Sequence, residues 1–266
     1  MRTPRVIVDT IPAVGQTIRL ADDEARHLAV LRRQVGDSVE LLTGEGASCR
    51  ARIDSLRSAK SGGRTVVEVV VRVVEVGAAV TEHGKNLPLA SWTLALAMVK
   101  GGAFDLALRM ASELGFGRVD PVITERTFVR WRGEESKKAR FERVVRESAK
   151  QCGRTPPLVV GDPQPLSDWL DEVSQRGGRR WICHVAAPVP APRGEAGDPA
   201  FPGDGPLEET FVLVGPEGGF SAAEVCLAAT HGFTPYRFRT PVLKTPTAVA
   251  VVGALGLLGA QLRAES

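Results

Sequence analysis

Two rhythms of apolar and polar positions divide the chain. Before residue 80, apolar and polar residues alternate, for example over Ala47–Leu56 and Thr65–Val76, as is typical of half-buried strands. Asp22–Leu31 instead has acids in its first turn and apolar residues at helical spacing, which predicts a short helix. Short strands around one short helix predict a small β-barrel-like domain at residues 1–80.

From residue 81 onward, strongly apolar strands alternate with helices. Apolar, β-rich runs predict strands at Trp92–Val99, Arg118–Thr124, Leu158–Val160, Arg180–His184, Thr210–Val214 and near Tyr236. Helical spacing predicts helices at Ala103–Leu114, Glu134–Gln151, Pro165–Val173, and from Ser221 and Thr247 onward. Such alternation predicts the α/β class, a parallel sheet covered by helices, in a second domain of residues 81–266.

Composition is that of an ordinary globular protein. The 266 residues are 43% hydrophobic and 24% charged, which allows a sizeable core. The most apolar segment, Thr247–Leu262, is too short and glycine-interrupted to predict a membrane span, and no apolar stretch of signal-peptide length follows Met1. Four scattered cysteines without a CxxC pair, and four histidines, do not predict a metal site. We therefore expect a soluble cytoplasmic protein that binds neither membrane nor metal.

Charge is unevenly distributed although the net charge is only +3. Residues 100–155 hold 13 Lys or Arg against 8 Asp or Glu, whereas residues 156–236 hold 4 against 11. Arginine supplies 27 of the 34 cations and suits bidentate phosphate contacts, so the basic stretch Arg130–Arg154 is a candidate RNA surface or simply a solvated helix face. Pro188–Glu209, rich in Pro, Gly and acids, predicts a surface excursion without catalytic residues.

The segment Phe211–Ser221 is the most informative for chemistry. An apolar strand runs into the turn Gly-Pro-Glu-Gly-Gly, after which Ser221 and Glu224 form the pattern of a helical capping box. Ligands of α/β sheets bind at such strand ends, where glycine lets backbone atoms approach closely. The turn lacks both GxGxxG and GxxxxGK[ST], so neither a nicotinamide dinucleotide site nor a P-loop is indicated.

A second segment, Phe238–Ala248, precedes the small-residue helix near the end of the chain. Its prolines Pro241 and Pro246 prevent regular helix before residue 247. The pattern fits either a plain loop with a core helix or a second binding loop.

Several motifs, in order along the chain, make it similar to the trefoil-knotted SPOUT methyltransferases. Most similar is the family that methylates N3 of a uridine in 16S ribosomal RNA. The matching segments are His27–Arg33 with Gly36-Asp37, Ser112–Gly115 with Thr124–Arg126, Arg143–Arg154, Leu213–Val225 (LVGPEGGFSAAEV) and Arg239–Ala248 (RTPVLKTPTA). The order of these motifs over most of the chain makes a chance resemblance improbable.

The resemblance implies a fold, a cofactor and partners. It implies a PUA-like RNA-binding domain followed by a knotted domain that binds S-adenosylmethionine (SAM), in a homodimer acting on 16S rRNA or the small ribosomal subunit. Implied cofactor-binding residues are His184, Val214, Gly215, Pro216, Gly218, Gly219, Val242, Leu243, Lys244, Thr245 and Thr247. Implied catalytic candidates are Glu217, Arg126 and Arg154, and RNA-binding candidates are Arg32, Arg33, Arg143 and Arg146.

Chemistry constrains these roles independently. Uracil N3 holds a proton and becomes a good nucleophile only when that proton leaves, so the site must stabilise a developing anion. Arginine suits that task, and Arg126 and Arg154 are the candidates. Glu217 is the carboxylate nearest in sequence to the glycine turn, and either accepts the proton or braces the loop.

One departure from the family pattern affects the second loop. Where the family has arginine and glutamate, this chain has Lys244 and Pro246. Lysine keeps the charge without the planar fork, and proline removes both the carboxylate and a backbone N–H. Two alternatives therefore stay open: another SPOUT target, such as a ribose 2′-hydroxyl or another base, and a non-catalytic ribosome-binding factor of the same fold.

Overall fold

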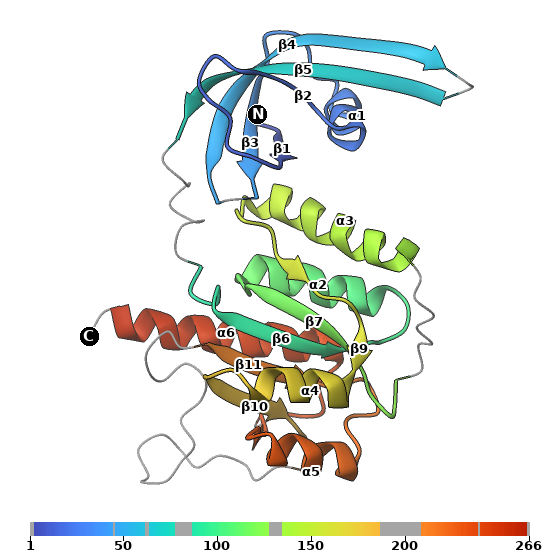
Figure 1. The fold of residues 1–266 in the computed structure, drawn as a ribbon, viewed down its shortest axis with the longest axis vertical. Helices are drawn as coiled ribbons and strands as arrows, with labels where there is room; N and C mark the ends of the chain where they lie inside the picture. The colour runs from blue at the N-terminus through green and yellow to red at the C-terminus, as the bar shows by residue number, and fades with distance from the viewer. Residues whose placement is uncertain are drawn as a thin grey trace. The chain divides into compact units, whose positions relative to one another are not determined.

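The structure is a computed structural model, and it describes residues 3–44, 46–61, 64–77, 87–127, 135–186, 209–238 and 240–264. The chain forms two compact units (Figure 1). The first, the N-terminal unit, contains Met1–Asn86 and Arg146–Pro157, and the second, the C-terminal unit, contains Leu87–Val145 and Leu158–Ser266. The boundary predicted after residue 80 and residues 188–208 of the predicted excursion lie outside the described residues.

The N-terminal unit is built on a mixed five-stranded sheet. Its elements are β1 (Arg5–Val8), β2 (Thr17–Arg19), α1 (Asp22–Val30), β3 (Ser38–Thr43), β4 (Ser48–Ser61) and β5 (Arg64–Val76). The strand order is β1-β3-β4-β5-β2, with β1 parallel to β3 and the other pairs antiparallel. Among the described residues no pairing joins β1 to β2, so the sheet is not closed and the predicted β-barrel-like domain is not confirmed.

A buried ion pair lies within this unit, at the start of α1. Glu24 is fully buried, and Lys150 places its Nζ 3.3 and 3.4 Å from the two carboxylate oxygens. Lys150 also contacts Glu147 at 2.6 Å, and Arg146 lies 3.6 Å from Glu24. Burial raises the pKa of Glu24, although the Lys150 charge opposes that shift. Desolvation therefore outweighs the pairing at this carboxyl group.

The C-terminal unit is α/β with a wholly parallel sheet, which confirms the predicted fold class. Its strands are β6 (Trp92–Ala97), β7 (Arg118–Ile123), β8 (Val159–Val160), β9 (Gln164–Pro165), β10 (Arg179–Cys183), β11 (Thr210–Val214) and β12 (Thr234–Tyr236). Their order is β12-β10-β11-β6-β7-β8, with β9 pairing β7. The helices are α2 (Gly102–Leu114), α4 (Leu166–Ser174), α5 (Ala222–Thr230), α6 (Thr245–Ala264) and the part of α3 (Glu135–Cys152) up to Val145, since α3 from Arg146 onward belongs to the N-terminal unit.

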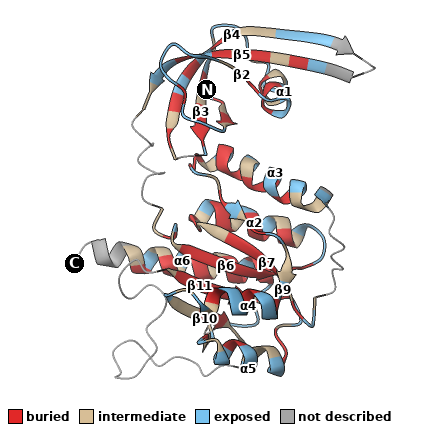
Figure 2. Ribbon diagram, in the orientation of Figure 1, coloured by how far each residue is buried: buried red, intermediate tan, exposed pale blue. Residues whose placement is uncertain are grey.

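Two apolar layers cover the two faces of this sheet (Figure 2). Strand β6 shows why, because side chains alternate between faces along a strand. Leu94 and Leu96 belong to one layer, with residues of α2, α3 and α6, whereas Ala95 and Ala97 belong to the other, with residues of α4 and α5. Both faces are buried, which explains the apolar run Leu94–Ala97 in β6.

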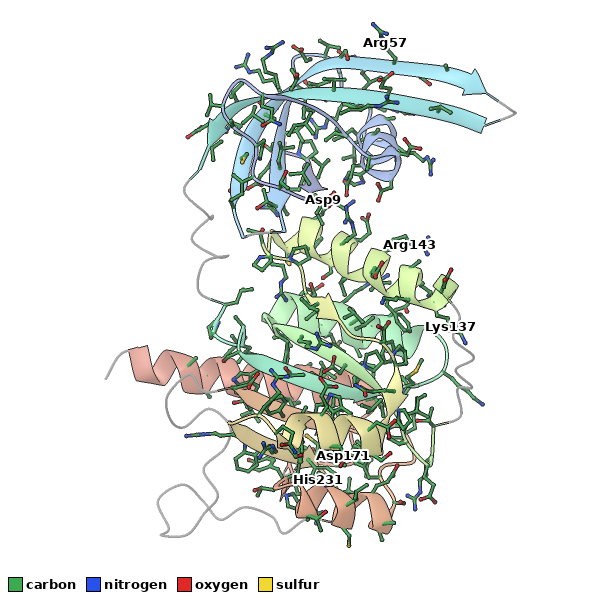
Figure 3. The ribbon with its side chains drawn as sticks, in the orientation of Figure 1. Asp9, Arg57, Lys137, Arg143, Asp171 and His231 are labelled. Carbon is green, nitrogen blue, oxygen red and sulfur yellow. The ribbon has the colours of Figure 1, made fainter. Side chains whose placement is uncertain are left out.

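The outer helices α4 and α5 are joined by a hydrogen bond between His231 and Asp171, which is an ion pair when His231 is protonated (Figure 3). His231, which ends α5, places Nε2 3.0 Å from the Asp171 carboxylate of α4 and Nδ1 2.8 Å from the Leu227 carbonyl. The hydrogen bond to the Leu227 carbonyl, and then that to Asp171, raises the pKa of His231.

The last helix starts earlier than the sequence predicts. The sequence predicts a start at Thr247, after Pro246, whereas α6 begins at Thr245. Proline is compatible with the first turn of a helix, where its missing N–H would have no partner within the helix.

Candidate active site

A cavity of about 350 Å³ lies at the carboxyl ends of parallel strands in the C-terminal unit. Its wall comes from the segments that follow β7, β10, β11 and β12, and from the start of α6. The chain reverses its direction of travel across the sheet between β6 and β11, and open α/β sheets bind ligands beside such a reversal. The fold therefore places this cavity where a ligand site is expected.

The glycine turn after β11 forms one wall. Gly219 has a φ of +66°, a left-handed conformation that favours glycine, and its N–H donates to the Pro216 carbonyl at 2.8 Å. A Cβ on Gly215 would lie 3.0 Å from the Phe220 ring. Ser221 then caps α5 through the predicted capping box with Glu224. Backbone conformation explains Gly219, and the lack of space for a side chain explains Gly215.

The start of α6 is fastened to that turn. Thr245 is buried, and its hydroxyl donates to the Gly215 carbonyl at 3.0 Å. Since Val242 and Leu243 also line the cavity, the two segments that the sequence singled out form one wall.

Arg126 approaches the glycine turn from the loop after β7. Its Nη1 donates to the Gly218 carbonyl at 2.7 Å. Arg126 also affects His184, at the end of β10. Burial lowers the pKa of His184, and the positive charge of the Arg126 guanidinium lowers it further. Both effects favour the neutral imidazole of His184. The neighbouring thiol is un-ionised as well, because burial raises the pKa of Cys183 to about 12.

Comparisons with known proteins bear directly on this site. The family model of the RNA methyltransferase domain matches residues 85–256. The chain belongs to this family. The match spans the whole cavity wall, and the SPOUT resemblance inferred from the motifs is confirmed.

Similar proteins and solved structures extend the match to more than nine-tenths of the chain. The Synechocystis ribosomal RNA small subunit methyltransferase E is 28% identical, over 93% of this chain and 75% of that protein. A methyltransferase of Legionella pneumophila, solved with bound SAM, has a TM-score of 0.81 at 27% identity over 97% of this chain and 98% of its own. A Neisseria gonorrhoeae ribosomal RNA small subunit methyltransferase E, also solved with SAM, has a TM-score of 0.76 at 26% identity, with 97% and 98% coverage.

Most of the predicted cofactor residues meet at the cavity. The residues that line it are His184, Val214, Gly215, Pro216, Gly218, Gly219, Val242, Leu243 and Thr245. Lys244 and Thr247 are not among them and are exposed. The reason is local, because Lys244 precedes the first turn of α6 and Thr247 falls on the outer side of that turn.

The predicted catalytic residues are divided between the two units. Glu217 and Arg126 line the cavity. Arg154 instead belongs to the N-terminal unit, where it is buried and its Nε donates to the Pro156 carbonyl at 3.0 Å. Burial lowers the pKa of Arg154 to about 10. Arg154 is not among the residues that line the cavity, and its catalytic role stays a prediction.

The four predicted RNA-binding arginines occupy different settings. Arg32 is exposed in the turn after α1, with a φ of +54°, and Arg33 beside it is half-buried. Arg143 is exposed on α3 (Figure 3), whereas Arg146 is half-buried beside Glu24. Exposed Arg32 and Arg143 are the better phosphate candidates.

The sequence reasoning did not single out the aromatic wall of the cavity. Tyr236 and Phe238 line it, with ring centroids 5.4 Å apart in an edge-to-face arrangement. Cys183, Phe220, Arg237 and Thr240 also contribute. A usable signal existed, since the one tyrosine of the chain lies two residues from a phenylalanine at a predicted strand end.

Two features that would change the chemistry are absent from the described part of the chain. No group of three or more His, Cys, Asp or Glu side chains placed to hold a metal ion was found there. Nor does any helix within those ranges have the length and apolar character needed to cross a membrane.

Proposed function

We propose that this chain is a SAM-dependent methyltransferase that methylates N3 of a uridine in 16S ribosomal RNA. One observation carries the proposal. Two separate motif segments, Gly215–Gly219 and Val242–Thr245, enclose a single cavity at the carboxyl ends of parallel strands, and the Thr245–Gly215 hydrogen bond joins them. Family membership and the SAM-bound neighbours support the same reading.

The residues present fit SAM. A volume of about 350 Å³ lies within the range of roughly 300–1,000 Å³ for small-molecule sites. Glycine backbone would face the polar parts of the cofactor, and Tyr236 and Phe238 offer aromatic surface for its adenine. When bound, SAM supplies an electrophilic methyl group on sulfur.

The residues around the cavity suit the uracil side of the reaction. Arg126 and Arg237 provide positive charge where an anionic uracil ring would develop. Two lining groups can accept the N3 proton, namely the Glu217 carboxylate and the neutral imidazole of His184. A uridine must leave its pairing partner to reach such a site, as is common in RNA recognition.

Three architectural features complete the proposal. The C-terminal unit forms the trefoil knot of SPOUT proteins, and the crossing of the chain from β11 past β10 to β12 is consistent with this. The N-terminal unit acts as a PUA-like RNA-binding module, in which Arg32 is exposed to contact phosphate. The enzyme works as a homodimer in the cytoplasm, where the ribosomal subunit is its substrate.

Methyl transfer to small ribosomal subunits tests the proposal. Subunits from a strain that lacks the protein are incubated with labelled SAM, and the digested nucleosides are identified by mass spectrometry. We expect 3-methyluridine. A different methylated nucleoside would redirect the target to another base or a ribose hydroxyl. Subunit binding without methylation would favour the ribosome-binding factor, and Pro246→Glu would then test whether the departure at that position abolished catalysis.

Two variants control the assay. Gly219→Val places a β-branched residue at a φ of +66°, which distorts the turn, so methyl transfer should fall at least roughly 10-fold. Gly177→Ala introduces a Cβ that meets no atom within 4 Å at a position without left-handed φ, so activity should be retained.

A further inference from the structure

The carboxylate of Glu224 joins two segments that are far apart in sequence. Its Oε1 accepts the backbone N–H of Glu125 at 2.7 Å, and its Oε2 accepts the backbone N–H of Ser221 at 2.8 Å. Both partners are donors, so both oxygens must accept. Only a carboxylate meets this requirement, because a glutamine in its place would turn an NH₂ group toward one of the two N–H groups.

The segment held at Glu125 is a rigid turn. Thr127 N–H donates to the Thr124 carbonyl at 3.0 Å, Thr124 N–H donates to the Thr127 hydroxyl at 3.0 Å, and the two hydroxyls lie 2.9 Å apart. Residues 124–127 thus form a turn held by its own internal hydrogen bonds. A hydrogen bond at Glu125 therefore fixes the position of the next residue, Arg126.

Arg126 is exposed at the rim of the cavity and depends on such fixation. The Arg126 side chain donates a hydrogen bond to the Gly218 carbonyl. Its Cβ and Cδ also lie close to Gly218, 3.4 Å from the position that a Cβ on this glycine would occupy. The aliphatic stem of Arg126 therefore packs against bare backbone. Its guanidinium stays at the cavity wall only while the two segments keep their relative positions.

We propose that Glu224 is a positioning residue, whose carboxylate fastens the 124–127 turn to the start of α5 and thereby holds the Arg126 guanidinium against the glycine turn. The capping box alone would explain the bond to Ser221, but not the bond to Glu125. The positioning of Arg126 by Glu224 does not depend on the proposed function. Its effect on methyl transfer does, because there Arg126 acts on the substrate.

The pKa of His184 tests this positioning without any enzymatic reaction. Histidine Cε1–H resonances of the full-length protein are titrated by NMR, with His184→Gln identifying the signal. Other titratable or charged side chains that line the cavity are Cys183, Glu217, Tyr236 and Arg237. Because the Arg126 charge lowers the pKa of His184, Arg126→Ala should raise it, and Glu224→Gln should give at least half of the same rise.

Two neighbouring variants separate positioning from charge and from capping. Glu125→Gln removes a carboxylate from the same turn, but that side chain is exposed and only its backbone N–H contacts Glu224. Ser221→Ala weakens the cap of α5 while the Glu224–Glu125 bond remains. Both should leave the pKa of His184 as in the parent protein. A rise in Ser221→Ala equal to that in Glu224→Gln, or no rise in Glu224→Gln, would overturn the proposal.

A double-mutant cycle on methyl transfer supplies the second readout. We expect Glu224→Gln to lower kcat roughly 10-fold, since small displacements of a catalytic group cost rate. In the Arg126→Ala background the same change should cost less than about 2-fold. Equal losses in both backgrounds would refute positioning through Arg126. Absence of methyl transfer in the parent protein would refute the proposed function and leave the NMR result to decide the positioning.

Discussion

Removal of Lys150 and removal of Glu24 should have very different effects on stability. Lys150→Met would leave the fully buried Glu24 carboxylate with Arg146, 3.6 Å away, as its remaining cation. Breaking a buried pair from one side costs about 3–5 kcal/mol. Because the Arg146 side chain is 34% exposed and still attracts the carboxylate, we expect about 3 kcal/mol.

Glu24→Gln should be tolerated. Lys150 would keep Glu147, 2.6 Å away with its side chain 55% exposed, so no buried charge would lose its partner. Burial raises the pKa of Glu24 despite Lys150, which means that the folded protein favours the uncharged carboxyl group more than the unfolded chain does. We expect a change within about 1 kcal/mol, and the double variant should recover most of the loss.

The pH dependence has a definite sign. A carboxyl group with a raised pKa stabilises the fold at low pH, and this contribution is lost as pH rises through the folded-state pKa. The deficit of Lys150→Met should therefore be largest at pH 7 and shrink toward pH 5. Toward pH 5, protonation of Glu24 removes the negative charge that the Lys150→Met variant leaves without its lysine partner.

Hydrogen exchange by mass spectrometry is the suitable assay. All four tryptophans lie at positions 92, 131, 169 and 181, beyond residues 1–86, so their fluorescence does not report on the N-terminal unit. Protection of peptides from β3, β4 and β5 gives the local free energy of opening. Equal losses for the two single variants, or a Lys150→Met deficit independent of pH, would refute the reasoning.

Two further predictions concern the C-terminal unit. Thr245→Val removes the hydrogen bond to the Gly215 carbonyl, which contributes about 1 kcal/mol, so calorimetry should show SAM binding weakened roughly fivefold. The control Thr247→Val, at an exposed position, should leave the affinity for SAM unchanged. Equal affinities of the two variants would contradict the role given to Thr245. His231→Gln should lower the melting temperature more at pH 6 than at pH 8.5, as measured by tryptophan fluorescence. The pKa of His231 is raised in the folded protein, so the interaction with Asp171 stabilises the fold only while the imidazole is protonated. An equal decrease at both pH values would be inconsistent with this ion pair.

The sequence by itself determined the local elements and the place of the glycine turn. Apolar runs and helical spacing located β6, β11 and α2 within a residue or two, because burial of a strand or a helix face leaves its own period in the chain. The capping box of Ser221 and Glu224 was equally visible, since both partners lie within four residues. The short strands β2 and β9, of three and two residues, left no such pattern.

Only the tertiary structure decided which of these elements meet. The strand order brings Arg126, His184 and Gly215 to one cavity and leaves Arg154 in the other unit, although motif reasoning had treated Arg126 and Arg154 alike. The bond from Glu224 to Glu125 spans 99 positions and has no local signature. Periodicity records whether a side chain is buried, whereas its neighbours are fixed by the packing of the whole sheet, which is a non-local property of the chain.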